Sequence, residues 1–158
     1  MSDLDYKEYT KQYNSELVIE FNEDNMYEYI KYYRKMNPRT RKSPIESPLC
    51  VSLNKFTSMV RIAQHDSKVK QSEYCMWLLE QLEIPKLMLE DCEIHYIATF
   101  PTKTRRDLDG LILNSKYYND VFVEYGLLKD DSFYQLRKLT FSAEYEKGVK
   151  KIRAIIRY

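Results

Sequence analysis

The segment IHYIATFPTKTRRDLDGLILNSKYYNDVFVEYG, residues 94–126, joins a strand pattern to a helix pattern through a charged turn. Apolar residues alternate from Ile94 to Phe100, which predicts a β-strand with one buried face. The stretch from Leu111 to Tyr125 has the length of a helix. Gly126 can close that helix, because glycine adopts the left-handed backbone found at many helix ends. A strand followed by a helix indicates a protein that contains both kinds of element.

The sequence before this segment adds elements of both kinds. Residues 17–21 (LVIEF) predict a short strand. Residues 24–36 predict a helix that must stop before Pro38, because the residue before a proline is disfavoured in helical geometry. Ser67 is a candidate N-cap for a further helix that runs to about Glu83.

The sequence after the segment predicts a β-hairpin. Residues 133–144 and 149–157 have the composition of strands, and Glu146-Lys147-Gly148 lies between them as a turn. We therefore expect an α+β fold, in which a small mixed sheet packs against helices in one domain.

The composition agrees with a single folded domain and excludes several classes of protein. The chain has 158 residues, of which 44% are hydrophobic and 31% charged, with a net charge of +1. Its three glycines are too far apart for a nucleotide-binding glycine loop. No apolar run has the length of a membrane span, and the first residues are polar. Three scattered cysteines suit a reducing compartment, so we expect a cytoplasmic protein without a membrane partner.

A basic segment, residues 31–43 (KYYRKMNPRTRKS), interrupts the otherwise balanced charge. It has six cations and no acid, and Tyr32 and Tyr33 lie among them. Such a segment can bind phosphates while its rings stack on bases. The alternative is an ordinary solvated surface. The six cations are Lys31, Arg34, Lys35, Arg39, Arg41 and Lys42.

Two pairs of aspartates flank the predicted helix of residues 111–125. Asp107 and Asp109 precede it, and Asp130 and Asp131 follow it. If the chain turns back after the helix, the two pairs can approach each other. Clustered carboxylates repel unless a cation joins them, and Mg²⁺ prefers oxygen ligands of this kind. Helix capping and an ordinary turn are the alternative roles for these aspartates.

Four further charged residues accompany these acids. Lys116 and Asp120 are four residues apart on the same helix face, a spacing that permits an ion pair. Arg105 and Arg106 come directly before the first acidic pair and can bind flanking phosphates.

The order of these residues resembles the RusA family of Holliday-junction resolvases, the phage and prophage endonucleases that cut four-way DNA junctions. The matching positions are the basic pair, Asp-x-Asp, Lys-x-x-x-Asp on the helix, the glycine and the final Asp-Asp. Ser52-Leu53-Asn54 is similar to an early turn of that family. The resemblance covers about residues 48–145 and implies two parts: an N-terminal strand with a basic insertion (1–47) and a RusA-like nuclease core (48–158). The residues that carry it are Asn54, Arg106, Asp107, Asp109, Lys116, Asp120, Gly126, Asp130 and Asp131.

The resemblance implies a homodimer that hydrolyses phosphodiester bonds in branched DNA with Mg²⁺ or Mn²⁺. Asp107, Asp109 and Asp131, together with Asp130, would hold the metal. Lys116 would stabilise charge on the scissile phosphate, and Asp120 would orient Lys116. The cations expected to contact DNA are those of the basic segment together with Lys103, Arg105 and Arg106.

Other interpretations of the sequence remain open. Gly110 stands where the family has asparagine, which favours a non-catalytic DNA-binding dimer. A structural protein whose acids only cap helices is a third possibility. Asp66-Ser67-Lys68 matches a fragment of another nuclease motif, but its place at a predicted helix start favours capping. His95 and Cys75 are expected to pack in the interior.

Overall fold

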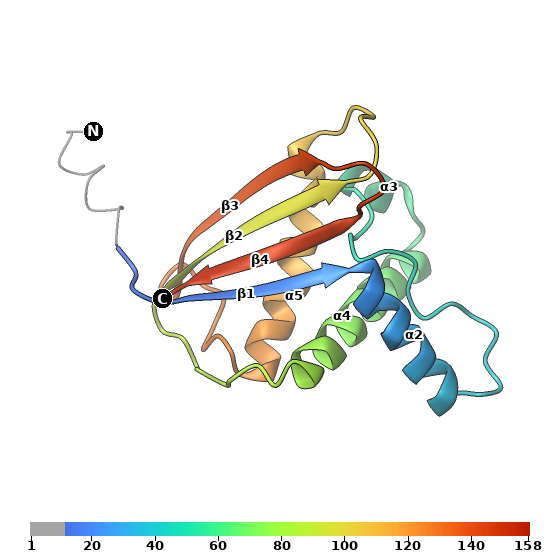
Figure 1. Cartoon of the computed structure of the whole chain (residues 1–158), viewed down its shortest axis with the longest axis horizontal. Coiled ribbons are helices and arrows are strands. Elements are labelled where there is room, and N and C mark those ends of the chain that lie inside the picture. Colours follow the sequence, from blue (N-terminus) through green and yellow to red (C-terminus); the bar gives the residue numbers. More distant parts are fainter. Residues whose placement is uncertain (1–11) are drawn as a thin grey trace.

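A four-stranded mixed sheet with helices packed on it forms the structure, a computed structural model that describes residues 12–158 (Figure 1). The α+β class and the mixed sheet expected from the sequence are confirmed. No helix in this described part of the chain is long and apolar enough to cross a membrane. In chain order the elements are β1 (Glu16–Asn22), α2 (Glu23–Met36), α3 (Leu53–Ser58), α4 (Arg61–Gln81), β2 (Cys92–Phe100), the short 3-10 helix η1 (Leu108–Leu111), α5 (Ile112–Tyr125), β3 (Leu136–Tyr145) and β4 (Lys151–Arg157).

The strand order is β1-β4-β2-β3, so the predicted hairpin of β3 and β4 is wrong. β2 lies between them, parallel to β3 and antiparallel to β4. The connection 146–150 is long enough to pass the end of β2. The amides of Glu146 and Gly148 donate to the carbonyls of Phe100 and Pro101 there. β2, α5 and β3 thus form a strand–helix–strand unit, the usual way to connect two parallel strands.

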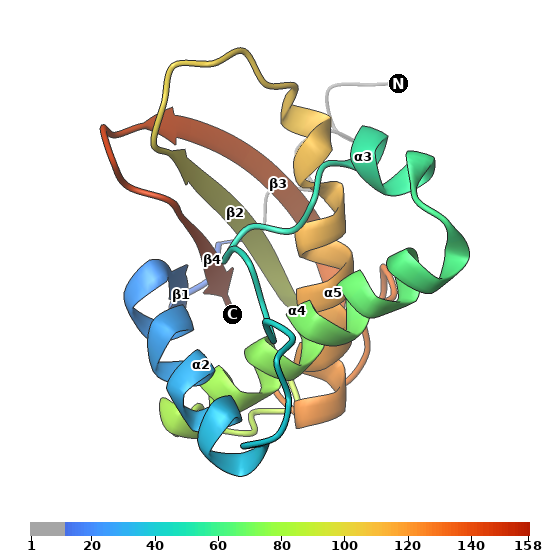
Figure 2. The same ribbon diagram turned by 90° about the vertical axis from the view of Figure 1, so that its right-hand side faces the viewer.

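Helices α4 and α5 cover one face of the sheet, and the core lies between these two layers (Figure 2). Aromatic side chains fill much of it. The rings of Phe21 and Tyr118 stack with centroids 4.0 Å apart, and Tyr74 meets Phe21 edge to face. Tyr96 and Phe122 are also fully buried. Several of the fifteen tyrosines are therefore interior residues, and their hydroxyl groups must find buried partners.

The helix boundaries show where local signals predict structure and where they fail. α2 begins at a capping box between Asn22 and Asn25 and ends at Met36, as expected. Gly126 closes α5 with φ of 96°, as expected. α4 instead begins at Arg61, so Ser67 lies inside the helix and is not its N-cap. The sequence prediction also missed α3, which begins at the N-cap Ser52.

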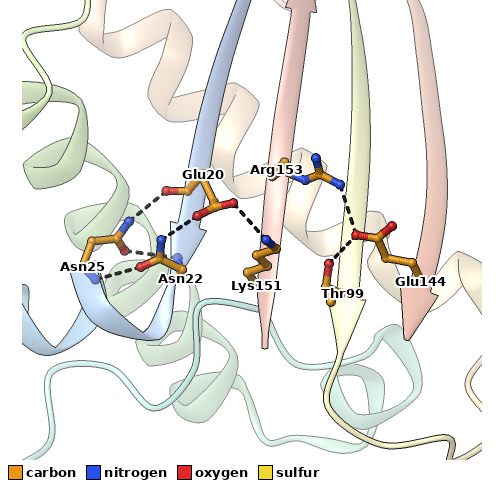
Figure 3. A network of polar contacts seen from close by, with 7 residues as sticks. All are labelled: Glu20, Asn22, Asn25, Thr99, Glu144, Lys151 and Arg153. Carbon is orange, nitrogen blue, oxygen red and sulfur yellow. Dashed lines mark hydrogen bonds and ion pairs between the residues drawn. The ribbon is translucent and has the colours of Figure 1, made fainter. Parts of the chain in front are cut away.

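The opposite face of the sheet carries a row of paired charges (Figure 3). Lys151 forms an ion pair with Glu20 at 3.3 Å, and Arg153 forms one with Glu144 at 3.1 Å. Glu144 also accepts a hydrogen bond from buried Thr99. These charges neutralise one another. Lys151 pairs with the neighbouring strand β1, and Arg153 reaches past β2 to Glu144 on β3.

A buried polar cluster fixes the chain between α2 and α3. Tyr118 donates to the carbonyl of Pro48 at 2.6 Å and accepts from Gln71 at 3.0 Å. Gln71 also donates to the carbonyl of Ser47 at 3.2 Å. Asn114 accepts from the amide of Cys50 at 2.8 Å. Side chains of α4 and α5 thus hold segment 47–50, which continues directly into Ser52 and α3.

We predict that Tyr118→Phe lowers the free energy of unfolding by about 1–3 kcal/mol, because it leaves buried partners unpaired. Tyr117→Phe is the matched control. Tyr117 is the adjacent residue of α5, and its buried hydroxyl has no hydrogen-bond partner among the residues described. Urea denaturation of the two variants checks this, and an equal loss of stability in both would contradict it.

Candidate functional site

A groove of about 490 Å³ lies where the loop after β2 faces segment 49–54. We call it the acid groove. Asp107, Asp109 and Gly110 line it from the loop and η1, and Ser52 and Asn54 line it from α3 and its N-cap. η1 and α3 are in contact, and Figure 2 shows α3 beside the start of the η1–α5 helix. The structure therefore brings Asn54 to the same groove as the first acidic pair.

The carboxylates of Asp107 and Asp109 are available to a ligand. Asp107 is the N-cap residue of η1, but its side chain makes no capping hydrogen bond. Within residues 12–158, neither carboxylate is in an ion pair or accepts a hydrogen bond. Capping therefore does not account for these two acids. A Cβ at Gly110 would make only an ordinary 3.6 Å contact with Ser52, so the groove has room for a larger residue there.

Arg106 is held in a fixed position at the edge of this groove. Its guanidinium lies 4.4 Å from the centre of the Phe100 ring. It donates to the carbonyls of Thr102 and Thr104, both at 3.2 Å, and to the hydroxyl of Thr102. Arg105 lines the same groove. Because these contacts already hold the Arg106 guanidinium, it loses little side-chain freedom when it binds an anion.

The second acidic pair lies elsewhere. Asp130 accepts a hydrogen bond from the amide of the next residue, Asp131. Burial raises the pKa of Asp131 above its usual range, and the nearby carboxylate of Asp120 raises it further. Neither Asp130 nor Asp131 lines the acid groove. The chain that returns after α5 therefore reaches the level of Asp120, not that of Asp109.

Lys116 lies between the two acidic pairs on the exposed side of α5. Lys116 and Asp120 lie on the same face of the helix. The helix rises about 12 Å between Ile112 and Asp120. Lys116 makes no ion pair with Asp120 or any other acid in the described part of the chain. Asp120 instead faces Asp131. The expected Lys116–Asp120 ion pair is thus not present.

No three Asp, Glu, His or Cys side chains among residues 12–158 are placed to share a metal ion. The four aspartates thus do not form one cage in this structure. Asp107 and Asp109 alone fit a weaker requirement, because Mg²⁺ is often held by one or two carboxylates together with waters and substrate phosphates. Any metal at the acid groove would depend on the substrate for part of its coordination shell.

The basic segment lies away from the acid groove. α2 and the loop after it run away from the 101–107 loop in both views (Figures 1 and 2). Lys31 pairs with Glu28 at 3.1 Å on an exposed face. Lys103 lies at the other side of the loop, with its ammonium 5.2 Å from the Tyr145 ring centre. The basic segment residues Lys31, Arg34, Lys35, Arg39, Arg41 and Lys42 are all exposed and absent from the groove lining.

The remaining candidate residues from the sequence lie in the sheet, the core or the interior of a helix. His95 lies half-buried on the open face of the sheet, between the hydroxyls of Thr140 and Ser142. Burial and the Arg157 guanidinium lower its pKa. Cys75 is fully buried in the core, as expected. Asp66 and Ser67 lie in the second turn of α4, so they do not cap it.

A second hollow of about 470 Å³ adjoins the acid groove and shares Leu49, Cys50, Phe100 and Arg106 with it. Three lysines line this hollow that the sequence did not predict as site residues. They come from α3, α4 and the chain just before β4. They are Lys55, Lys70 and Lys150. No pattern in the sequence groups them, because only the folded chain brings these segments together.

No protein-family model and no curated protein matches the chain.

We predict that Asp131→Asn stabilises the protein at neutral pH, by at most about 1 kcal/mol because the site is exposed. The folded-state pKa of Asp131 is raised, so the folded protein binds this proton more tightly than the unfolded chain does. Wild-type stability therefore falls as pH rises from the ordinary value of 3.8 through the raised pKa. The advantage of the variant should disappear at lower pH.

A double-mutant cycle with Asp120→Asn provides the control for this prediction. Each single substitution removes the same repulsion, so the double variant should gain less than the sum of the two. Thermal denaturation between pH 3 and 8 measures all four proteins. A wild type more stable than Asp131→Asn at neutral pH would show that the pair does not repel.

Proposed function

We propose that this protein is a metal-dependent endonuclease that cuts branched DNA at the acid groove. The observation that carries the proposal is the exposure of two carboxylates, Asp107 and Asp109, which have no partner among residues 12–158 and lie beside Arg105 and Arg106. Two acids next to two cations suit a phosphodiester, which needs both a cation site and direct phosphate contacts. The order of residues that resembles the RusA family supports the same reaction and adds a four-way junction as the substrate.

The residues of the groove divide the work of hydrolysis between them. Asp107 and Asp109 would hold Mg²⁺ or Mn²⁺, which would supply an acidified water and stabilise charge on the phosphate. Arg105 and Arg106 bind phosphate oxygens and position the strand. Asn54, which lines the opposite wall, would donate a hydrogen bond to the same backbone. Lys116 does not line the groove, and it would act as a point charge toward the developing negative charge from the exposed side of α5.

A four-way junction has two equivalent strands to cut, so we propose a homodimer with two-fold symmetry. The ten-residue edge strand β3 supports this proposal, because its outer side pairs with no strand of the described chain. Leu139 and Tyr145 are exposed on it. A sedimentation mass near 19 kDa at micromolar concentration would contradict the dimer.

By the same resemblance, the protein would act in the cytoplasm of a bacterial host and be encoded by a phage or prophage.

A non-catalytic DNA-binding dimer is the second candidate, and one observation favours it. Asp130 and Asp131 do not join the first acidic pair, so the groove has two acids where the resemblance implies up to four. A protein that binds DNA without cutting it would tolerate the absence of the second acidic pair from the groove. It would not require unpaired carboxylates close to the phosphates it binds, which is why we prefer the enzyme.

We predict that Asp107→Asn and Asp109→Asn each reduce cleavage of a synthetic four-way junction by about 10²-fold or more. Junction binding should stay the same or become tighter, because a negative charge near the phosphates is lost. Asp130→Asn is the matched control: it removes the same charge outside the groove and should retain cleavage. Cleavage in Mg²⁺ and binding in EDTA are measured separately.

Retained cleavage in both groove variants would contradict the assignment of the active site. Loss of cleavage in Asp130→Asn equal to that in Asp107→Asn would show that the two acidic pairs act together on DNA. Binding without cleavage by the wild-type protein, in either metal, would favour the non-catalytic alternative.

We predict a different effect for Lys116→Ala, a lower single-turnover rate with little change in junction affinity. A point charge aimed at the reacting phosphate stabilises the transition state more than the bound substrate. Lys116→Arg should restore the rate poorly, because a planar guanidinium does not replace an ammonium. An unchanged rate with weakened binding would make Lys116 an ordinary phosphate contact.

A further inference from the structure

The second hollow brings together cations from separate segments of the chain. Lys55, Lys70 and Lys150 line it together with Arg106, against the two acids Glu46 and Asp66. None of the three ammonium groups is in an ion pair or donates a hydrogen bond among the described residues. The hollow thus gathers cations without neutralising them.

Lys150 and the next residue along the chain have different surroundings. Its neighbour Lys151 lies on the open face of the sheet and pairs with Glu20 at 3.3 Å. Lys150 lines the hollow, is half-buried and has no acidic partner in the part of the chain described. Lys70 is also half-buried. Partly desolvated cations in a concave site attract anions more strongly than cations on an open surface.

The hollow continues the acid groove. Arg106 and Phe100 line both, and their stacked side chains lie where the two meet. Leu49, Val51, Met59 and Ala63 supply apolar surface in the second hollow. A single DNA strand that leaves the acid groove can therefore pass Arg106 and place its next phosphates among the three lysines. A base of the same strand would then lie against Phe100.

We propose that this second hollow binds the phosphates of the DNA strand adjacent to the scissile group, through Lys55, Lys70 and Lys150. The inference rests on the proposed function, because it takes the strand from the acid groove. It assigns the principal phosphate contacts to these lysines and not to the exposed basic segment of residues 31–43. Each of the three contributes one charge to a backbone contact that does not depend on sequence.

The test compares Lys70→Ala and Lys150→Ala with Lys68→Ala. Lys68 is an exposed lysine on the same helix as Lys70 and lines neither hollow. The probe is a fluorescein-labelled synthetic four-way junction, and its affinity is measured by anisotropy in EDTA over a range of salt concentrations. Each variant of the hollow should bind several-fold more weakly and lower the salt slope by about one unit. Lys68→Ala should match the wild type.

Two further proteins make the result specific. Lys70→Arg retains the charge and should restore the salt slope, which a purely structural lysine would not require. Lys35→Ala tests the basic segment and should change the slope less than Lys70→Ala does. Thermal midpoints equal to that of the wild type confirm that the variants fold.

Binding and cleavage fail independently in this design. Wild-type cleavage, with Lys70→Ala and Lys150→Ala slopes equal to that of Lys68→Ala, would overturn the inference and leave the nuclease intact. Binding without cleavage would contradict the nuclease, while reduced slopes in the two variants would still support the hollow. A wild-type protein that does not bind the junction would overturn both.

Discussion

The hydrogen bonds between segment 47–50 and the two core helices determine the shape of the candidate site. Gln71 and Tyr118 hold Ser47 and Pro48, and Asn114 holds Cys50. Leu49 and Cys50 line both hollows, and the chain continues directly to Ser52 and Asn54. Without these buried contacts one wall of each hollow would be a free loop. Buried polar groups specify a single arrangement because any other leaves them unsatisfied.

Local sequence patterns predicted most of the elements but not how the strands pair. Alternation identified β2, and Gly126 marked the end of α5. The hairpin was wrong because the connection 146–150 satisfies two of its amides at Phe100 and Pro101 and crosses β2. The order strand, helix, strand from residue 94 to residue 144 is itself typical of a parallel pair. It was the better signal for β3 than the short turn beside it.

The candidate site was predictable to the same extent. The sequence has Asp107 and Asp109 as an acidic pair directly before the helix, and both line the groove. The return of Asp131 depended on the path of the chain after Gly126. Leu89 pairs with Leu128 there, and Asp131 reaches only Asp120. Lys55, Lys70 and Lys150 meet only in three dimensions, so no spacing rule applied to a single sequence could group them.

Among residues 12–158, several charges on the open face of the sheet are paired, whereas the acids Asp107 and Asp109 and the three lysines of the second hollow have no ion-pair partner. On the open face of the sheet, Arg157 pairs with acids on both neighbouring strands and Arg153 pairs with Glu144 on β3, and these contacts need no ligand. At the end where β2 finishes, Asp107 and Asp109 on one side and the lysines on the other have no such partners in residues 12–158. The lysines and acids lie in adjoining hollows but do not neutralise each other. A phosphodiester with a divalent cation carries both signs of charge, so it can satisfy the acids and the lysines together.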